Sequence, residues 1–115
     1  MAGYNDLIVF QKAYDLALWL YPIVGRFPKN QRFVLGEQIE NEIINILTEI
    51  IEANKESGTK RGELLKQISI DLDKLMVLFR MAKDLKFVNI KKYGVFAEKA
   101  VEIGKLLGGW QKILV

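Results

Sequence analysis

Residues 31–56, QRFVLGEQIENEIINILTEIIEANKE, decide the fold of this chain. Large aliphatic side chains recur there every three or four positions, which at about 100° per residue places them on one face of a helix. That face consists of Leu35, Ile39, Ile43, Ile46, Leu47, Ile50 and Ile51. Isoleucine alone would suit a strand. The period favours a helix, and we therefore predict an amphipathic helix from about Gln31 to about Glu56.

Three further helices are expected around this one. They run from about Asp6 to Val24, from about Arg61 to Lys86, and from near Asn89 toward Trp110. Asn5 or Asp6 is the expected N-cap of the first helix, and Gly25 is its expected left-handed stop. Short connections favour antiparallel neighbours. We therefore predict an all-α fold, with residues 1–115 as a single domain built as an antiparallel up-down-up-down four-helix bundle.

The composition excludes several kinds of chemistry. The chain has 115 residues, of which 50% are hydrophobic and 27% are charged, a balance typical of globular proteins. Because it contains neither Cys nor His, it has no thiol nucleophile, no imidazole base, and no thiolate or imidazole metal ligand. No Gly-rich phosphate loop follows a strand. We expect no enzymatic activity, no metal site and no cofactor.

The sequence also bears on localisation. No run approaches the roughly 20 apolar residues that a membrane span needs. The N-terminal segment lacks the basic region of a secretory signal. Together with the absence of cysteine, these features predict a cytoplasmic protein with no membrane association.

Two apolar stripes run along the predicted third helix. The first consists of Leu65, Ile68, Leu72, Leu75, Met76, Phe79 and Ala82. The second lies nearly opposite and consists of Ile70, Val77, Leu78, Met81 and Leu85. A helix in a four-helix bundle buries one broad face, so a second apolar face needs a second partner surface. Two interpretations stay open: a wide core within one chain, or an interface between subunits.

Positive charge is concentrated toward the C-terminus. Residues 1–73 carry 8 basic and 11 acidic side chains, whereas residues 74–115 carry 9 basic and 3 acidic ones. One basic group, around the third loop, consists of Arg80, Lys83, Lys86, Lys91 and Lys92. Another, around the first loop, consists of Arg26, Lys29 and Arg32. In an antiparallel bundle these loops share an end, so we expect one basic end that binds nucleic acid or another anionic partner.

Two features weaken that interpretation. Lys83 and Lys86 fall in the last turn of a predicted helix, where cations also complement the helix dipole. Aromatic side chains that could stack on bases are scarce near the basic end. Tyr93 and Phe87 are the candidates, and residues of these types more often belong to a core. Direct reading of bases is therefore not predicted.

Three segments carry a resemblance to a known family. They are LALWLYPIVGRFPKNQRFVLGEQIEN (residues 16–41), DKLMVLFRMAKDLKFV (73–88) and EIGKLLGGW (102–110). In order and spacing they resemble the accessory variability determinant (Avd) proteins of diversity-generating retroelements. The resemblance extends from Tyr14 to Lys112. A more distant similarity, in the helix layout and the Phe-Pro loop, is to the four-helix bundle proteins encoded in ribosomal RNA intervening sequences.

The resemblance implies a function that composition does not. Avd proteins form a barrel-shaped homopentamer with a basic surface. They bind the reverse transcriptase of their element together with RNA or DNA, and they support mutagenic retrohoming without being the polymerase. By position, Arg80 and Lys83 match the basic part of the family's third helix, and Arg26 and Arg32 match its basic loop. Two alternatives stay open: a general RNA-binding bundle with no polymerase partner, and a bundle that binds only proteins.

Overall fold

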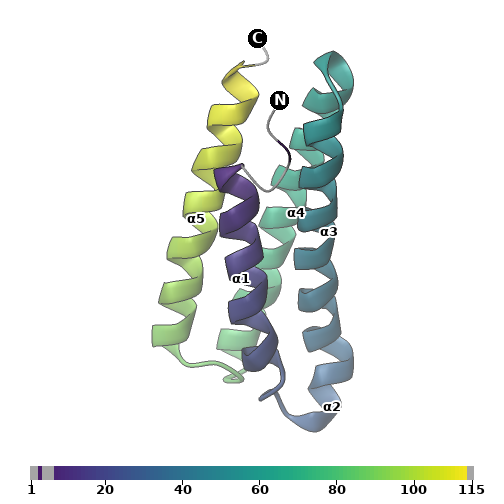
Figure 1. The fold of residues 1–115 in the computed structure, drawn as a ribbon. Helices are drawn as coiled ribbons and strands as arrows, with labels where there is room; N and C mark the ends of the chain where they lie inside the picture. Colours follow the sequence, from purple (N-terminus) through teal and green to yellow (C-terminus); the bar gives the residue numbers. More distant parts are fainter. Residues whose placement is uncertain (1–2, 4–6, 114–115) are drawn as a thin grey trace.

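The computed structural model of this chain describes residue 3 and residues 7–113. Every element within them is helical: α1 (Ile8–Val24), α2 (Lys29–Gln31), the π-helix η2 (Arg32–Gly36), α3 (Glu37–Lys55), α4 (Gly58–Asp84) and α5 (Ile90–Ile113). The prediction of an all-α fold is confirmed. Figure 1 shows α1, α3, α4 and α5 side by side along one axis. None of the helices in this part of the chain is long and apolar enough to cross a membrane.

The helix ends differ from the predicted ones at several points. Asn5 and Asp6, the expected caps of α1, lie outside the described residues. Gly25 is right-handed, with φ of −59°, so the predicted left-handed stop is wrong. The chain leaves α1 through tight turns instead, in which the Arg26 N–H donates to the Ile23 carbonyl at 3.0 Å. At the other end of the chain, α5 runs through Gly108 and Gly109 to Ile113.

The core lies along the common axis of the four long helices. The predicted apolar face of residues 31–56 is confirmed: Leu35 of η2 and four isoleucines of α3 are buried, and Leu47 and Ile51 are half-buried. The first stripe of α4 is buried too, apart from the half-buried Met76. Phe79 is its centre: its ring centroid lies 4.4 Å from that of Phe96 on α5 and 6.0 Å from that of Trp19 on α1. Each such buried side chain stabilises the fold by about 1.5–3 kcal/mol.

A glycine lets α1 approach the segment that leads into α3. Gly36 ends η2 and is buried against Val24 of α1. A Cβ atom at Gly36 would lie 2.7 Å from Val24 Cγ1, which is closer than two carbon atoms can pack. The neighbouring valine is stiff about χ1 and cannot easily move away. Only glycine therefore allows the two helices to meet at this distance.

We expect Gly36→Ala to lower the free energy of unfolding by about 1–3 kcal/mol, because the added methyl group forces α1 and α3 apart. Gly94→Ala is the matched control, since Gly94 lies within α5 with open space around its Cβ position. Alanine is the better helix former, so that control should gain about 0.5–1 kcal/mol. Urea denaturation of both variants measures the effect. Equal shifts for the two variants would contradict the close approach.

Candidate nucleic-acid interface

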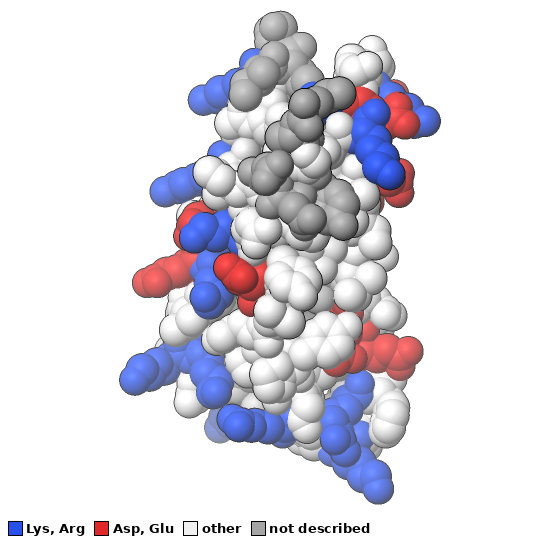
Figure 2. Space-filling model, in the orientation of Figure 1, with Lys and Arg blue, Asp and Glu red and all other residues white. Residues whose placement is uncertain are grey.

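The α1–α2 and α4–α5 connections lie at the same end of the molecule (Figure 1). Phe27 of the first packs against Phe87 of the second, with their ring centroids 5.5 Å apart. Phe27 and the adjoining Val88 are buried, and Phe87 is half-buried. The structure thus brings both predicted basic groups to one end, which we call the basic end. Figure 2 shows Lys and Arg side chains gathered there, with the acidic side chains of that face lying farther along the bundle.

The first basic group surrounds the start of η2. Arg26 and Lys29 are exposed, and neither forms an ion pair within the part of the chain that the structure describes. Arg32 is half-buried and closes the loop, because its Nη1 donates a hydrogen bond to the Gly25 carbonyl at 3.4 Å. Its Nε is buried and finds no partner among residues 3 and 7–113. Arg32 therefore holds the loop through one of its N–H groups, while its buried Nε–H has no hydrogen-bond partner among the described residues.

The second basic group is partly neutralised by Asp84. Arg80 Nε lies 3.8 Å from one oxygen of that carboxylate, and Lys83 Nζ lies 3.3 Å from the other. Lys83 Nζ also lies over the ring of Tyr93, 4.6 Å from its centroid. These contacts leave Arg80 and Lys83 with less free charge than their positions in the sequence indicate.

Of the remaining lysines of this group, Lys86 lies in the turn after α4, and Lys91 and Lys92 lie in the first turn of α5. The helix ends at Asp84, two residues before the predicted end at Lys86, and Lys86 has a left-handed φ of 67°. Lys86 and Lys91 are exposed and Lys92 is half-buried, and none of them forms an ion pair within the described residues. The Asn89 side chain caps the start of α5, since its Oδ1 accepts the Lys92 N–H at 2.8 Å.

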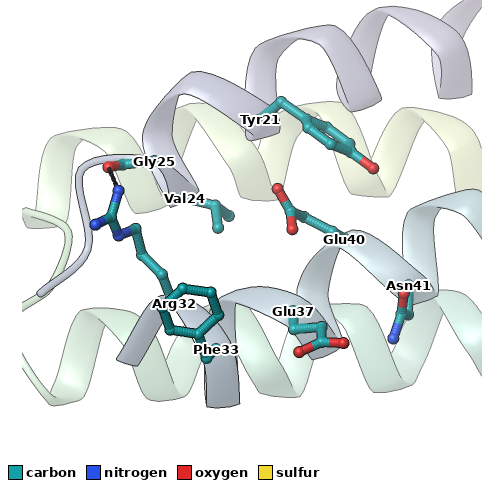
Figure 3. Close-up of a pocket in the computed structure, with 8 residues that line it drawn as sticks. All are labelled: Tyr21, Val24, Gly25, Arg32, Phe33, Glu37, Glu40 and Asn41. Carbon is teal, nitrogen blue, oxygen red and sulfur yellow. Dashed lines mark hydrogen bonds between the residues drawn. The ribbon is translucent and has the colours of Figure 1, made fainter. Parts of the chain in front are cut away.

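The aromatic side chain that is exposed at the basic end was not predicted from the sequence. Phe87 and Tyr93, the two candidates, are half-buried against Phe27 and Phe79 respectively. Phe33 is 71% exposed instead. A signal was available, because Phe33 precedes the buried Leu35 by two positions and so lies about 200° around the helix from the core face. Phe33 lines a pocket between α1 and α3 (Figure 3).

The comparison with known protein families covers nearly the whole described chain. The family model described as bAvd-like matches residues 7–114. The chain belongs to the bAvd-like family. No protein among the curated ones matches it. The Avd resemblance of the sequence is therefore shown at the level of the family, and the match includes both basic groups, η2 and all four long helices.

The second apolar stripe of this bAvd-like chain lies outside its core. Val77 is 58% exposed, and Ile70, Met81 and Leu85 are about half exposed, whereas Leu78 is half-buried. The interpretation of this stripe as part of a wide core within one chain is therefore wrong for its four exposed members. Ile70, Val77 and Leu78 also line a shallow pocket with Glu42 and Lys74. The bundle leaves this face of α4 open.

An acidic cluster lies between α3 and α4. Asp71 is 5% exposed, accepts a hydrogen bond from Gln67 Nε2 at 3.0 Å, and lies 3.8 Å from Lys74 Nζ. Partial burial, the hydrogen-bonding contact with Asp71, and the charges of Asp71, Glu42 and Glu52 raise the pKa of the Glu49 carboxyl to about 8. A protonated Glu49 can donate to Asp71. Within the described residues, no group of Asp and Glu side chains has the arrangement of a metal site.

The raised pKa of Glu49 predicts a pH-dependent stability. A carboxyl whose pKa rises on folding binds more protons in the folded state, so the stability falls as pH increases from 4.5 toward about 8. Glu49→Gln keeps the shape and removes the charge. We expect the variant to be more stable than the wild type by about 1 kcal/mol at pH 8, allowing for screening by solvent at a half-exposed side chain.

Urea denaturation between about pH 5 and about pH 9 checks this prediction. Glu63→Gln is the control, because Glu63 is exposed on α4 and lies outside the cluster. Its pH profile should follow that of the wild type. Parallel profiles for Glu49→Gln and the wild type would show that Glu49 is already ionised in the folded chain at neutral pH.

Proposed function

We propose that this chain is a non-enzymatic accessory protein of a diversity-generating retroelement. In this role it acts in the cytoplasm, binding the reverse transcriptase of the element together with its template RNA or the cDNA, and so supports mutagenic retrohoming. Two findings support the proposal. The chain belongs to the bAvd-like family. The packing of Phe27 against Phe87 brings both basic groups to one end.

The basic end suits a nucleic-acid backbone better than it suits a small anion. Four cations are exposed and lack ion pairs within the described residues: Arg26, Lys29, Lys86 and Lys91. They come from the two neighbouring loops and from the starts of α2 and α5 that follow them. Several such cations can each neutralise a phosphate, and the released counterions favour binding without reading sequence. Binding polymerase and strand on one protein raises their local concentration, which is the scaffolding mechanism that we propose.

The double variant Lys29→Glu/Lys91→Glu tests the basic end with one substitution in each loop. We expect weaker binding of single-stranded RNA and a shallower dependence of log K on log salt, by roughly 0.7 per lost phosphate contact. The control is Lys55→Glu/Lys66→Glu, since both lysines are exposed, form no ion pair in the described part, and lie toward the opposite end. Fluorescence anisotropy at several salt concentrations measures both.

The two variants must differ for the assignment to hold. If both lose affinity equally, binding depends on net charge and not on the basic end. If the Lys29/Lys91 variant binds RNA like the wild type, the basic end is not the interface. Synthesis of cDNA by a reconstituted element then separates the role in retrohoming from general RNA binding, because an RNA-binding bundle without a polymerase partner would not support it.

The open face of α4 supports an assembly of several copies. We propose that the up-down-up-down bundle forms a barrel-shaped homopentamer, in which this face packs on a second copy. Exposed apolar side chains on one helix face, here Ile70, Val77, Met81 and Leu85, are typical of protein interfaces. Family membership supports a second copy as the occupant.

Val77→Glu tests the assembly, because Val77 is 58% exposed and its replacement leaves the core of the single chain intact. Light scattering should give five times 13.2 kDa for the wild type and a lower mass for the variant. Thr48→Glu, on the exposed face of α3, should leave the mass unchanged. A wild-type monomer at both low and high salt would rule out the ring. Circular dichroism confirms that each variant remains helical.

A further inference from the structure

The pocket beside the basic end contains donors, acceptors and an exposed ring. Tyr21 and Val24 of α1, Arg32 and Phe33 of η2, and Glu40 and Asn41 of α3 line it. In the view of Figure 3, Val24 lies between the Arg32 guanidinium and the Glu40 carboxylate, and the Phe33 ring lies on the η2 side of the pocket. The pocket therefore offers positive charge on one side, hydrogen-bond acceptors on the other, and an apolar surface between them.

The ring of Phe33 is exposed to solvent, although the π-helix η2 that carries it packs against the core. It is 71% exposed, while Leu35 and Gly36 of the same π-helix are buried. Exposing a whole phenyl ring forgoes the roughly 1.5–3 kcal/mol that its burial would contribute. Single π-helical turns inside longer helices are frequent at functional sites. Burial of Leu35 and Gly36 thus fixes the position of the Phe33 ring, although the ring itself contributes little to the core.

The charges around the ring are arranged asymmetrically. Arg32 Nε is buried without a partner among the described residues, and the exposed Lys29 precedes it by three positions. On the other side, Glu37 and Glu40 form no ion pair within the described residues. Partial burial and the nearby charge of Glu37 raise the pKa of Glu40. A ligand that donates a hydrogen bond to Glu40 would offset this unfavourable environment.

We propose that this pocket binds one unpaired nucleotide of the nucleic-acid strand, with its base stacked on Phe33, its phosphate at Lys29 and Arg32, and a base amino group donating to Glu40. The inference rests on the proposed function and assigns a specific contact to it. A nucleotide combines an anionic group, a flat ring and a donor edge, and Arg32, Phe33 and Glu40 of the pocket offer a counterpart to each. A basic peptide would instead place its cations beside Arg26, Lys29 and Arg32, where like charges repel.

The nature of the contact also predicts which bases are preferred. Adenine, cytosine and guanine carry an exocyclic amino group that can donate to a carboxylate, whereas uracil presents carbonyl oxygens at the corresponding positions. Stacking on a phenyl ring is available to every base. We therefore expect the wild-type chain to bind single-stranded oligoadenylate more tightly than oligouridylate of the same length.

Phe33→Ala is the decisive variant. We expect its Kd for a single-stranded oligoadenylate of about 12 nucleotides to rise roughly 5- to 150-fold, which corresponds to the 1–3 kcal/mol of one stacked base. The salt dependence should stay that of the wild type, because no charge changes. Phe33→Trp should keep the affinity within about threefold. Ile90→Ala is the matched control, since Ile90 is apolar, 79% exposed, at the same end and outside this pocket.

The outcomes separate this inference from the proposed function. If the wild type binds the oligonucleotide in a salt-dependent manner and Phe33→Ala binds it equally well, the pocket assignment is overturned and the basic end stands. If Phe33→Ala weakens only binding of the reverse transcriptase, the pocket serves a protein partner and the nucleotide assignment is overturned. No binding by the wild-type chain at low salt would overturn both.

Discussion

The contact between Phe27 and Phe87 is the interaction on which the rest of the basic end depends. Two loops that carry eight cations between them and their flanking turns repel each other at short range. The aromatic pair and Val88 bury apolar surface between the loops, and each such side chain contributes about 1.5–3 kcal/mol. Residual repulsion between solvated charges is smaller than this, because water and salt screen it. Hydrophobic burial therefore keeps the like charges together.

Part of the positive charge at the basic end is paired within the chain. Asp84 contacts both Arg80 and Lys83, and the Gly25 carbonyl holds Arg32. At the basic end, the exposed cations that form no ion pair with another described residue lie in the two loops and at the starts of α2 and α5, and not on α4. A flexible anionic strand can follow cations that lie on two loops. A rigid ligand that needs a flat charged face fits such a surface less well. Under the proposed function, the distribution of ion pairs, more than the net charge of +3, would determine where a phosphate backbone binds.

Much of the architecture could be predicted because periodicity reports it directly. The apolar face that runs from Leu35 of η2 to Ile51 of α3, and the presence of two stripes on α4, follow from 3.6 residues per turn, whereas periodicity left open whether the second stripe is buried. The partners of Arg80 and Lys83 could not be predicted, because they depend on side-chain rotamers near Asp84. The π-helix η2 could not be predicted from the sequence either, for a different reason. Gly36 at its end is buried against Val24 of α1, and a tertiary contact of this kind leaves no local pattern in the sequence.

The ion pairs that weaken the charge of α4 also bear on the proposed assembly. Met81 and Leu85 of the open face lie one residue away from Arg80 and Asp84, so a second copy that packs on this face comes close to these charged groups. An unpaired arginine at such a boundary would lose solvation without a compensating charge. Pairing with Asp84 reduces this penalty. In the proposed ring, Asp84 thus favours assembly along α4, while the loops keep the free cations that a nucleic acid needs.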